Sequence, residues 1–175
     1  MTDAEWTAPE VERAESPRAA GEREMLEGWL EFHRQTLLLK CTGLTAEQLR
    51  LRSTEPSTLS LLGLVRHMAE VERWWFRSAW LEEKLPEIYC TDDNRDGDFD
   101  DVDTADAEAD FATFQTELEL ARKAAEQHSL DDTFTSRRGT QLNLRWVYVH
   151  MIEEYARHNG HADLIRERID GTAGV

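Results

Sequence analysis

Apolar residues recur at three- and four-residue steps along most of this chain, and this spacing constrains its fold more than any other feature. Residues three and four apart lie on one face of a helix, so the spacing predicts amphipathic helices. Pro86 and Gly171 are stop signals that close two of them. The four predicted helices run from Met25 to the stop at Gly43 and over about residues 57–85, 105–127 and 143–169.

The connections between these helices indicate how they are arranged. A long acidic connection, roughly residues 86–103, lies between the second and third helices and suits a crossover in a bundle. Thr45, with Gln48 three residues later, predicts a short turn of helix, and the segment around Gly139 is the only candidate for a short extended pair. The predicted fold class is therefore all-α: a four-helix bundle with a long acidic crossover between helices 2 and 3.

Length and composition predict one domain with a polar extension. The chain has 175 residues, which fits a single core. Residues 1–20 have apolar side chains that are too few and too scattered for a buried face, so we expect a flexible acidic N-terminal arm in which Trp6 is loosely docked. Residues 21–175 are expected to form the single bundle domain.

Charge and cysteine content exclude several classes of partner and location. Thirty-six acidic residues against 20 basic ones give a net charge of -16, which repels nucleic acid and anionic lipid. We find no apolar signal segment and no apolar run of the roughly 20 residues that a membrane span needs. Two cysteines, Cys41 and Cys90, are too few for a disulfide framework. We therefore expect a cytoplasmic protein with neither nucleic acid nor membrane as a partner.

The apolar face of the fourth predicted helix is interrupted by a carboxylate and an imidazole. Steps of three and four residues give Val147, Met151, Glu154, His158, Ala162 and Ile165. A buried carboxylate without a partner costs several kcal/mol, so Glu154 and His158 need an ion pair, hydrogen bonds or a metal. The second helix has a matching feature, because His67 lies three residues after Leu64 and four before Val71.

Together, His67, Glu154 and His158 predict a set of two histidines and one carboxylate that spans two helices of the bundle. Three protein ligands leave coordination positions open, which is typical of a catalytic metal site. The alternative is an ordinary core histidine beside an ion pair within one helix, since most buried polar groups find such partners.

Two long segments are distinctive: LLGLVRHMAEVERWWF in the second helix and WVYVHMIEEYARHNGHADLIRERIDG in the fourth. Together with the acidic loop between them, they resemble the DinB-like (YfiT-like) metal-binding four-helix bundles. The resemblance is strongest to the actinobacterial branch related to mycothiol-dependent maleylpyruvate isomerase, and it covers about residues 22–172. It implies that His67, Glu154 and His158 hold a divalent metal, with zinc expected and nickel or iron as alternatives. It also favours a homodimer.

Other residues near the predicted ligands have two interpretations. His150 and His161 lie within about a quarter turn of the ligand face and could serve as acid/base groups or orient the ligands, or they could be rim histidines in ordinary ion pairs. Arg145 and Arg157, like Arg166, could bind an anionic cofactor or substrate, or could form solvated ion pairs. The cluster of Trp74, Trp75 and Phe76 could be core, dimer surface or pocket wall.

The segment DDNRDGDFDDVD, residues 92–103, fits the ligand pattern of an EF-hand calcium loop. Its twelfth residue is Asp103 and not the usual glutamate, Pro86 breaks the preceding segment, and the chain has no second loop of this kind. We therefore favour an acidic solvated crossover over a calcium site.

The resemblance and the ligand set predict a function. A divalent metal would activate a low-molecular-weight thiol, mycothiol in the family analogy, for attack on an electrophilic small molecule, so that the protein would be an S-transferase or isomerase. Neither Cys41 nor Cys90 lies in an activating motif, so the sulfur would come from the co-substrate. Two alternatives stay open: a non-catalytic metal-binding stress or scavenging protein, and a metal-dependent hydrolase.

Overall fold

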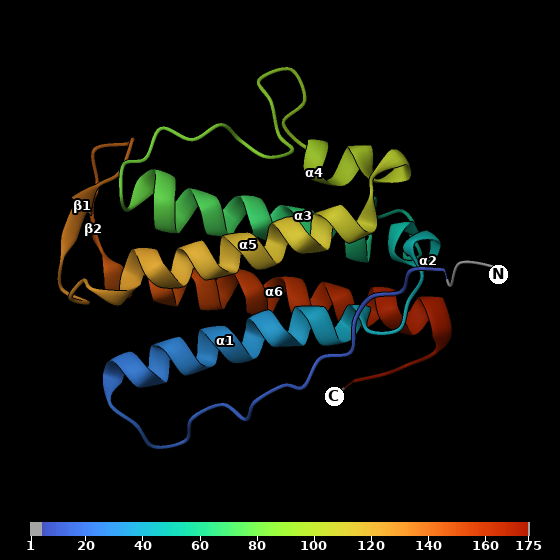
Figure 1. Ribbon diagram of the computed structural model, residues 1–175, viewed down its shortest axis with the longest axis horizontal. Helices are drawn as coiled ribbons and strands as arrows, with labels where there is room; N and C mark the ends of the chain where they lie inside the picture. The colour runs from blue at the N-terminus through green and yellow to red at the C-terminus, as the bar shows by residue number, and fades with distance from the viewer. Residues whose placement is uncertain (1–4, 175) are drawn as a thin grey trace.

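A computed structural model describes residues 5–174 and shows a bundle of four long helices. These are α1 (Glu22–Cys41), α3 (Leu61–Glu72), α5 (Ala107–Glu126) and α6 (Leu144–Asp170). Helix α1 packs along α6, and α3 packs along α5, so the bundle has two layers of two helices (Figure 1). The predicted all-α four-helix bundle is confirmed. Within the described residues, no helix has both the length and the apolar character that a membrane crossing requires.

Two shorter elements close opposite ends of the bundle (Figure 1). Helix α2 (Ala46–Arg50) begins at Thr45, whose side chain accepts a hydrogen bond from the Gln48 N–H, and the Gln48 side chain accepts one from the Thr45 N–H. At the other end, strands β1 (Thr133–Thr135) and β2 (Gln141–Asn143) form an antiparallel hairpin with Phe134 opposite Leu142. The predicted helical turn and the predicted extended pair are thus both confirmed.

The second predicted helix is shorter than its apolar pattern indicates. Helix α3 passes at Arg73 into a π-helical segment, η1 (Arg73–Ala79), and helical structure ends there instead of at Leu85. The wider turns of a π-helix shift the positions of the side chains that follow. Phe76 is consequently buried in the core, whereas Trp74 and Trp75 are only half-buried. The positive φ of 55° at Glu82 is incompatible with continued helix.

The acidic crossover runs along the outer side of α3 and carries two short helical turns, α4 (Gly97–Asp100) and η2 (Asp101–Thr104) (Figure 1). Arg66 of α3 anchors it, because its guanidinium donates to the carbonyl oxygens of Gly97 and Asp98, both at 3.0 Å. Gly97 is required at this point, since an added Cβ would lie 2.4 Å from the Tyr89 carbonyl oxygen. The crossover is therefore an ordered wall of the bundle.

The segment that the sequence predicts to be a flexible arm follows the surface of the bundle. Its first four residues lie outside the described part of the chain. The Ala8 N–H donates to the Leu44 carbonyl at 2.9 Å, and the Gly43 N–H donates to the Ala8 carbonyl at 3.0 Å. The Trp6 ring meets the Phe111 ring edge-on at 5.5 Å between centroids. Trp6 is therefore docked on the bundle through its contact with Phe111.

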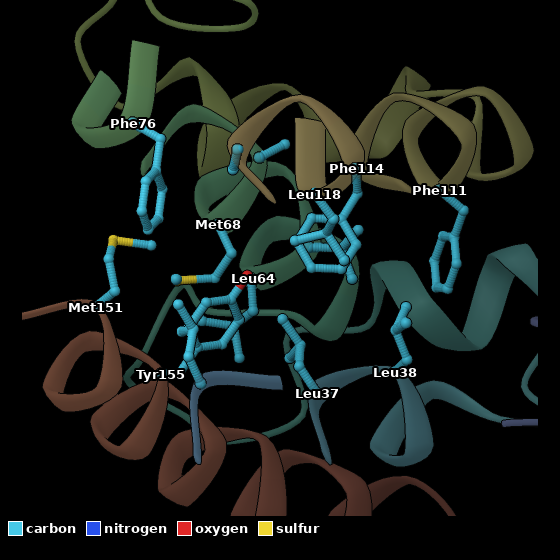
Figure 2. Close-up of a cluster of buried hydrophobic side chains, with 14 of the residues drawn as sticks. Leu37, Leu38, Leu64, Met68, Phe76, Phe111, Phe114, Leu118, Met151 and Tyr155 are labelled. Carbon is cyan, nitrogen blue, oxygen red and sulfur yellow. The ribbon is translucent and has the colours of Figure 1, made fainter. Parts of the chain in front are cut away.

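The core lies between the two layers of helices and is mostly aliphatic and aromatic. Figure 2 shows Leu37 of α1, Leu64 and Met68 of α3, and Phe114 of α5 converging in it. Burial of these apolar side chains favours folding. Tyr155 of α6 also reaches this cluster, and it brings a hydroxyl group that requires a partner.

That partner is a fully buried carboxylate at the centre of the bundle. Glu72 of α3 is 0% exposed. It accepts hydrogen bonds from Arg34 Nε at 2.8 Å, from Arg34 Nη2 at 2.6 Å and from the Tyr155 hydroxyl at 2.8 Å. One charged network therefore joins α1, α3 and α6. Burial and the neighbouring Glu72 charge raise the pKa of Tyr155, so its hydroxyl remains a donor.

Removing one member of this network should destabilise the protein strongly. Arg34→Met leaves the Glu72 carboxylate buried without its ion-pair partner, which should lower the free energy of unfolding by about 3–5 kcal/mol. Urea denaturation followed by circular dichroism measures this change. The matched control is Arg122→Met, which breaks an exposed pair with Glu31 and should cost less than about 1 kcal/mol. Arg34→Met/Glu72→Leu should regain part of the loss, and a double variant less stable than Arg34→Met would contradict this account.

Candidate metal centre

Three side chains that the sequence predicts as ligands meet between α3 and α6. His67 comes from the middle of α3, and Glu154 and His158 come from successive turns of α6. Each offers one ligand atom, and all of these atoms lie within 4.8 Å of one another. The side chains are 24%, 18% and 12% exposed, respectively, so the group lies at the edge of the core with access to solvent. The imidazole rings of His67 and His158 are 4.7 Å apart, edge to face.

The orientation of His67 is set by a residue that the sequence analysis did not select. The buried Asp98 carboxylate of the crossover lies with Oδ2 2.8 Å from His67 Nδ1. This contact occupies one ring nitrogen and leaves Nε2 available as a ligand, which is the arrangement usual for metal-binding histidines. The Phe99 ring stacks on the imidazole at 5.0 Å. In the sequence, Asp98 is one of many aspartates in an acidic loop, and only its burial distinguishes it.

Glu154 has several polar neighbours but makes no hydrogen bond within the described residues. Its carboxylate oxygens lie 3.5 Å from His158 Nε2, 3.7 Å from His150 Nε2 and 3.9 Å from Arg157 Nη1. These separations are too long for good hydrogen bonds. A carboxylate that converges with two imidazoles without bonding to them has the donor chemistry and the spare lone pairs that a divalent cation requires.

His158 is held in its neutral form. Burial lowers its pKa to about 4, and the nearby charges of His67, His161 and Arg157 add to this effect. At neutral pH the ring therefore carries a free lone pair, and neutral imidazole is the form that binds metals. The other ring nitrogen, Nδ1, lies 3.4 Å from His161 Nδ1.

His150 and His161 both lie beside the predicted ligands, as their helical spacing indicates. His150 belongs to a second group of potential ligands, with Glu153 and Glu154. Its ring stacks on Trp146 at 4.8 Å and meets Trp75 edge-on at 4.7 Å. His161 contacts His158, as described above. The structure brings both histidines to the site, and their roles in acid/base chemistry stay a prediction.

The arginines predicted to bind an anion are engaged elsewhere or only approach the site. Arg145 makes ion pairs with Glu22 and Asp131 on the side of α6 that faces α1. Arg166 is bound to Asp170 and to two backbone carbonyl groups. Arg157 is more than half exposed and pairs with Glu153. Of the three, only Arg157 lies beside a predicted metal ligand, Glu154.

Several acidic side chains of residues 92–103, the segment with the calcium-loop pattern, contact other protein groups in the described structure. Neither of the two ligand groups found in residues 5–174 includes a residue of this segment. Asp103 pairs with Arg52 at 2.7 Å, and Asp101 accepts a hydrogen bond from Asn94. Asp98, at the seventh position of the pattern, is directed to His67. The favoured interpretation of this segment as a crossover agrees with its structure, although it is partly buried and not simply solvated.

A cavity of about 260 Å³ opens beside His67. Trp74 and Trp75 form part of its wall, and Cys90 also lines it. Burial raises the pKa of Cys90 to about 11, and that of the fully buried Cys41 to about 12. Both thiols therefore stay protonated at neutral pH and are poor nucleophiles. A thiolate at this site would have to come from a bound small molecule.

The environment of His158 can be tested by titrating the metal-free protein. We expect its pKa to be about 4, because burial and neighbouring positive groups disfavour the imidazolium form. An NMR titration of the imidazole signals through the acidic range measures this value. Arg157→Gln removes one repelling charge and should raise the pKa of His158. A midpoint at the ordinary value of 6.5 in the unsubstituted protein would contradict the buried, neutral state.

The chain matches the model of a known protein family. A family described as mycothiol S-transferase matches residues 25–171, which include all four long helices except the first turn of α1, together with the complete ligand set. No curated protein and no solved structure gave a match. This family is consistent with the DinB-like resemblance of the sequence, and the match extends over most of the chain. The chain therefore belongs to the mycothiol S-transferase family.

Proposed function

We propose that this protein is a mycothiol-dependent S-transferase in which His67, Glu154 and His158 hold a divalent metal, with zinc expected and nickel or iron as alternatives. The observation that best supports this proposal is that the ligand atoms of these three side chains lie close together. Asp98 contacts the other ring nitrogen of His67, and the chain belongs to this family. Three protein ligands leave room for an exogenous group at the centre, as in catalytic sites.

The metal supplies a positive charge that favours the thiolate form of a bound low-molecular-weight thiol over its protonated form. The remaining contribution comes from the chain. Trp74, Trp75 and Phe99 form the aromatic part of the lining of the cavity beside His67, and Glu70, Glu87, Asp96 and Asp98 form its acidic part.

Proton transfer is assigned to the histidines next to the ligands. His150 lies next to Glu154, and His161 lies next to His158. Each histidine is therefore a direct neighbour of one proposed metal ligand. Either one could accept the thiol proton and pass it to solvent, since an imidazole placed beside the reacting group is the side chain that most often carries out general acid–base catalysis. Cys41 and Cys90 are not used, because burial raises the pKa of each thiol.

If these three side chains are the ligands, replacing either histidine should remove the metal from the protein. His67→Ala and His158→Ala should each abolish stoichiometric metal binding, whereas the native chain should retain about one ion. Elemental analysis of the purified proteins measures the content. The control is His128→Ala, which removes an exposed histidine paired with Asp132. Full metal content in His67→Ala would refute the ligand set, and metal-loaded protein without any mycothiol-conjugating activity would refute the transferase assignment.

Asp98 should control the affinity for the metal without being a ligand. Asp98→Asn keeps the shape of the side chain but removes the charge that orients His67, so metal affinity should fall about 10- to 100-fold. Competition with a chelator measures the affinity, and circular dichroism verifies the fold. Asp92→Asn changes an exposed aspartate of the same crossover and serves as the matched control. Equal affinities in the two variants would show that Asp98 does not support the site.

A further inference from the structure

A second and larger cavity adjoins the proposed metal centre. Its volume is about 1000 Å³, and it lies between η1, the start of the crossover and the β1–β2 hairpin. It shares Trp74 and Trp75 with the small cavity beside His67. Trp75 also contacts the ring of Trp146, at 5.1 Å, and the ring of His150. The two cavities therefore share the aromatic wall of Trp74 and Trp75 in their linings, and His67 lines the small cavity whereas the hairpin lines the large one.

The positive charges around this wall are unusual for an acidic protein. Within residues 5–174, most lysines and arginines form an ion pair or donate a hydrogen bond to another protein group. The side chains in this range that do neither are Lys84, Arg95, Lys123, Arg137 and Arg138. Lys84, Arg137 and Arg138 line the larger cavity, and Arg95 lines the small one.

In the described part of the chain, Lys84, Arg137 and Arg138 form no ion pair, although Arg137 also lines a smaller cavity with Glu70, Glu87 and Asp92. Glu83 is already held by Arg77 at 2.8 Å, which leaves Glu82 as the other acidic residue of the lining. The Arg137 guanidinium lies over the Trp74 ring, 4.1 Å from its centroid. Stacking of this kind leaves the N–H groups of a guanidinium free in its own plane, where they can bind an oxyanion in bidentate fashion. The cavity thus combines an apolar aromatic wall with three cations that form no ion pair in the described part of the chain.

We propose that this cavity binds the electrophilic co-substrate of the reaction and selects an apolar or aromatic anion, such as an aryl carboxylate or sulfonate. The proposal rests on the transferase function proposed above. The apolar body packs against Trp74, Trp75 and Leu142, and the anionic group binds Arg137 and Arg138 of the hairpin turn. The opposite end of the molecule then lies at Trp74 and Trp75, which also line the cavity beside His67.

The geometry divides the two substrates between the two cavities. The thiol binds at the ligand set, and the electrophile approaches from across the Trp75 wall. In the reaction, the thiolate sulfur forms a bond to the electrophilic carbon, the leaving group departs with the electron pair of its broken bond, and the thiol proton passes to solvent. The hairpin arginines touch only the far end of the electrophile, so they determine which electrophile binds.

A pair of fluorescent probes tests the cavity without requiring turnover. Anilinonaphthalene sulfonate carries an anionic group, whereas N-phenylnaphthylamine has the same rings without charge. Arg137→Gln/Arg138→Gln should weaken binding of the sulfonate about tenfold, the loss expected for a charged hydrogen-bonded contact, and should leave binding of the neutral probe unchanged. Both arginines are exposed, so circular dichroism should show an unaltered fold.

The control variant carries the same charge change elsewhere. Arg18→Gln/Lys123→Gln removes two positive charges outside the cavity, and Lys123 lines a separate cavity of about 710 Å³ between α1 and α5. Sulfonate affinity should be unchanged in this variant. A loss there equal to that in the hairpin variant, or equal losses for both probes, would overturn the proposal.

A kinetic comparison separates this proposal from the proposed function. With mycothiol and metal, Arg137→Gln/Arg138→Gln should raise KM for para-bromomethylbenzoate about tenfold and leave KM for the uncharged para-methylbenzyl bromide unchanged. If the variant converts both bromides and the ratio of their two KM values equals that of the unsubstituted protein, the co-substrate site is refuted and the transferase function stands. No activity on either, in a protein that still binds the sulfonate through the hairpin arginines, would refute the transferase function and keep the anion-binding cavity.

Discussion

The buried network of Arg34, Glu72 and Tyr155 is the interaction on which the other parts of the site depend. A carboxylate that is fully removed from water is stable only while its partners stay in place, so the network fixes α1, α3 and α6 relative to one another. Glu72 lies five residues after His67 on α3, and Tyr155 directly follows Glu154 on α6. A rotation or a shift of either helix that separated the ligand atoms would also break this network. The alignment of the proposed metal ligands is thus maintained from inside the core.

The crossover makes the second contribution, because it supplies the group that orients His67. Arg66 binds the backbone of Gly97 and Asp98 and also pairs with Asp110 of α5 at 3.1 Å. This holds the Asp98 carboxylate against the imidazole in spite of the high negative charge of the loop. An acidic segment that would otherwise be repelled from an acidic protein is thereby kept in contact with α3. Its contribution to the site depends on one buried arginine.

The π-helical segment η1 connects the core to the cavities. In this segment one ring, that of Phe76, enters the core, while the preceding Trp74 and Trp75 form a wall that two cavities share. Insertions of this kind within α-helices are frequent at functional sites because they change the direction of side chains locally. Here the change places aromatic surface between the ligand set and the arginines of the hairpin.

Much of the fold and the core of the candidate site could be predicted from the sequence. Helical periodicity, the cap at Thr45 and the turn at Gly139 are local properties that depend on residues a few positions apart. The same periodicity placed His67, Glu154 and His158 on buried faces, and the structure brings them together. The predicted second helix was too long, because its apolar pattern continues beyond Ala79, where helical structure ends, and does not reveal the positive φ at Glu82.

The tertiary structure decided the features that depend on contacts between distant segments. Asp98 reaches His67 from 31 residues away, and the sequence offers no means of distinguishing it from its acidic neighbours. The sequence allows Arg145 to bind an anion, but in the structure its guanidinium is already paired with Glu22 and Asp131. The sequence by itself determined where helices form and which of their faces are buried, because these depend on local spacing and capping. Which charges are neutralised and which remain free depends on how the helices and the hairpin pack.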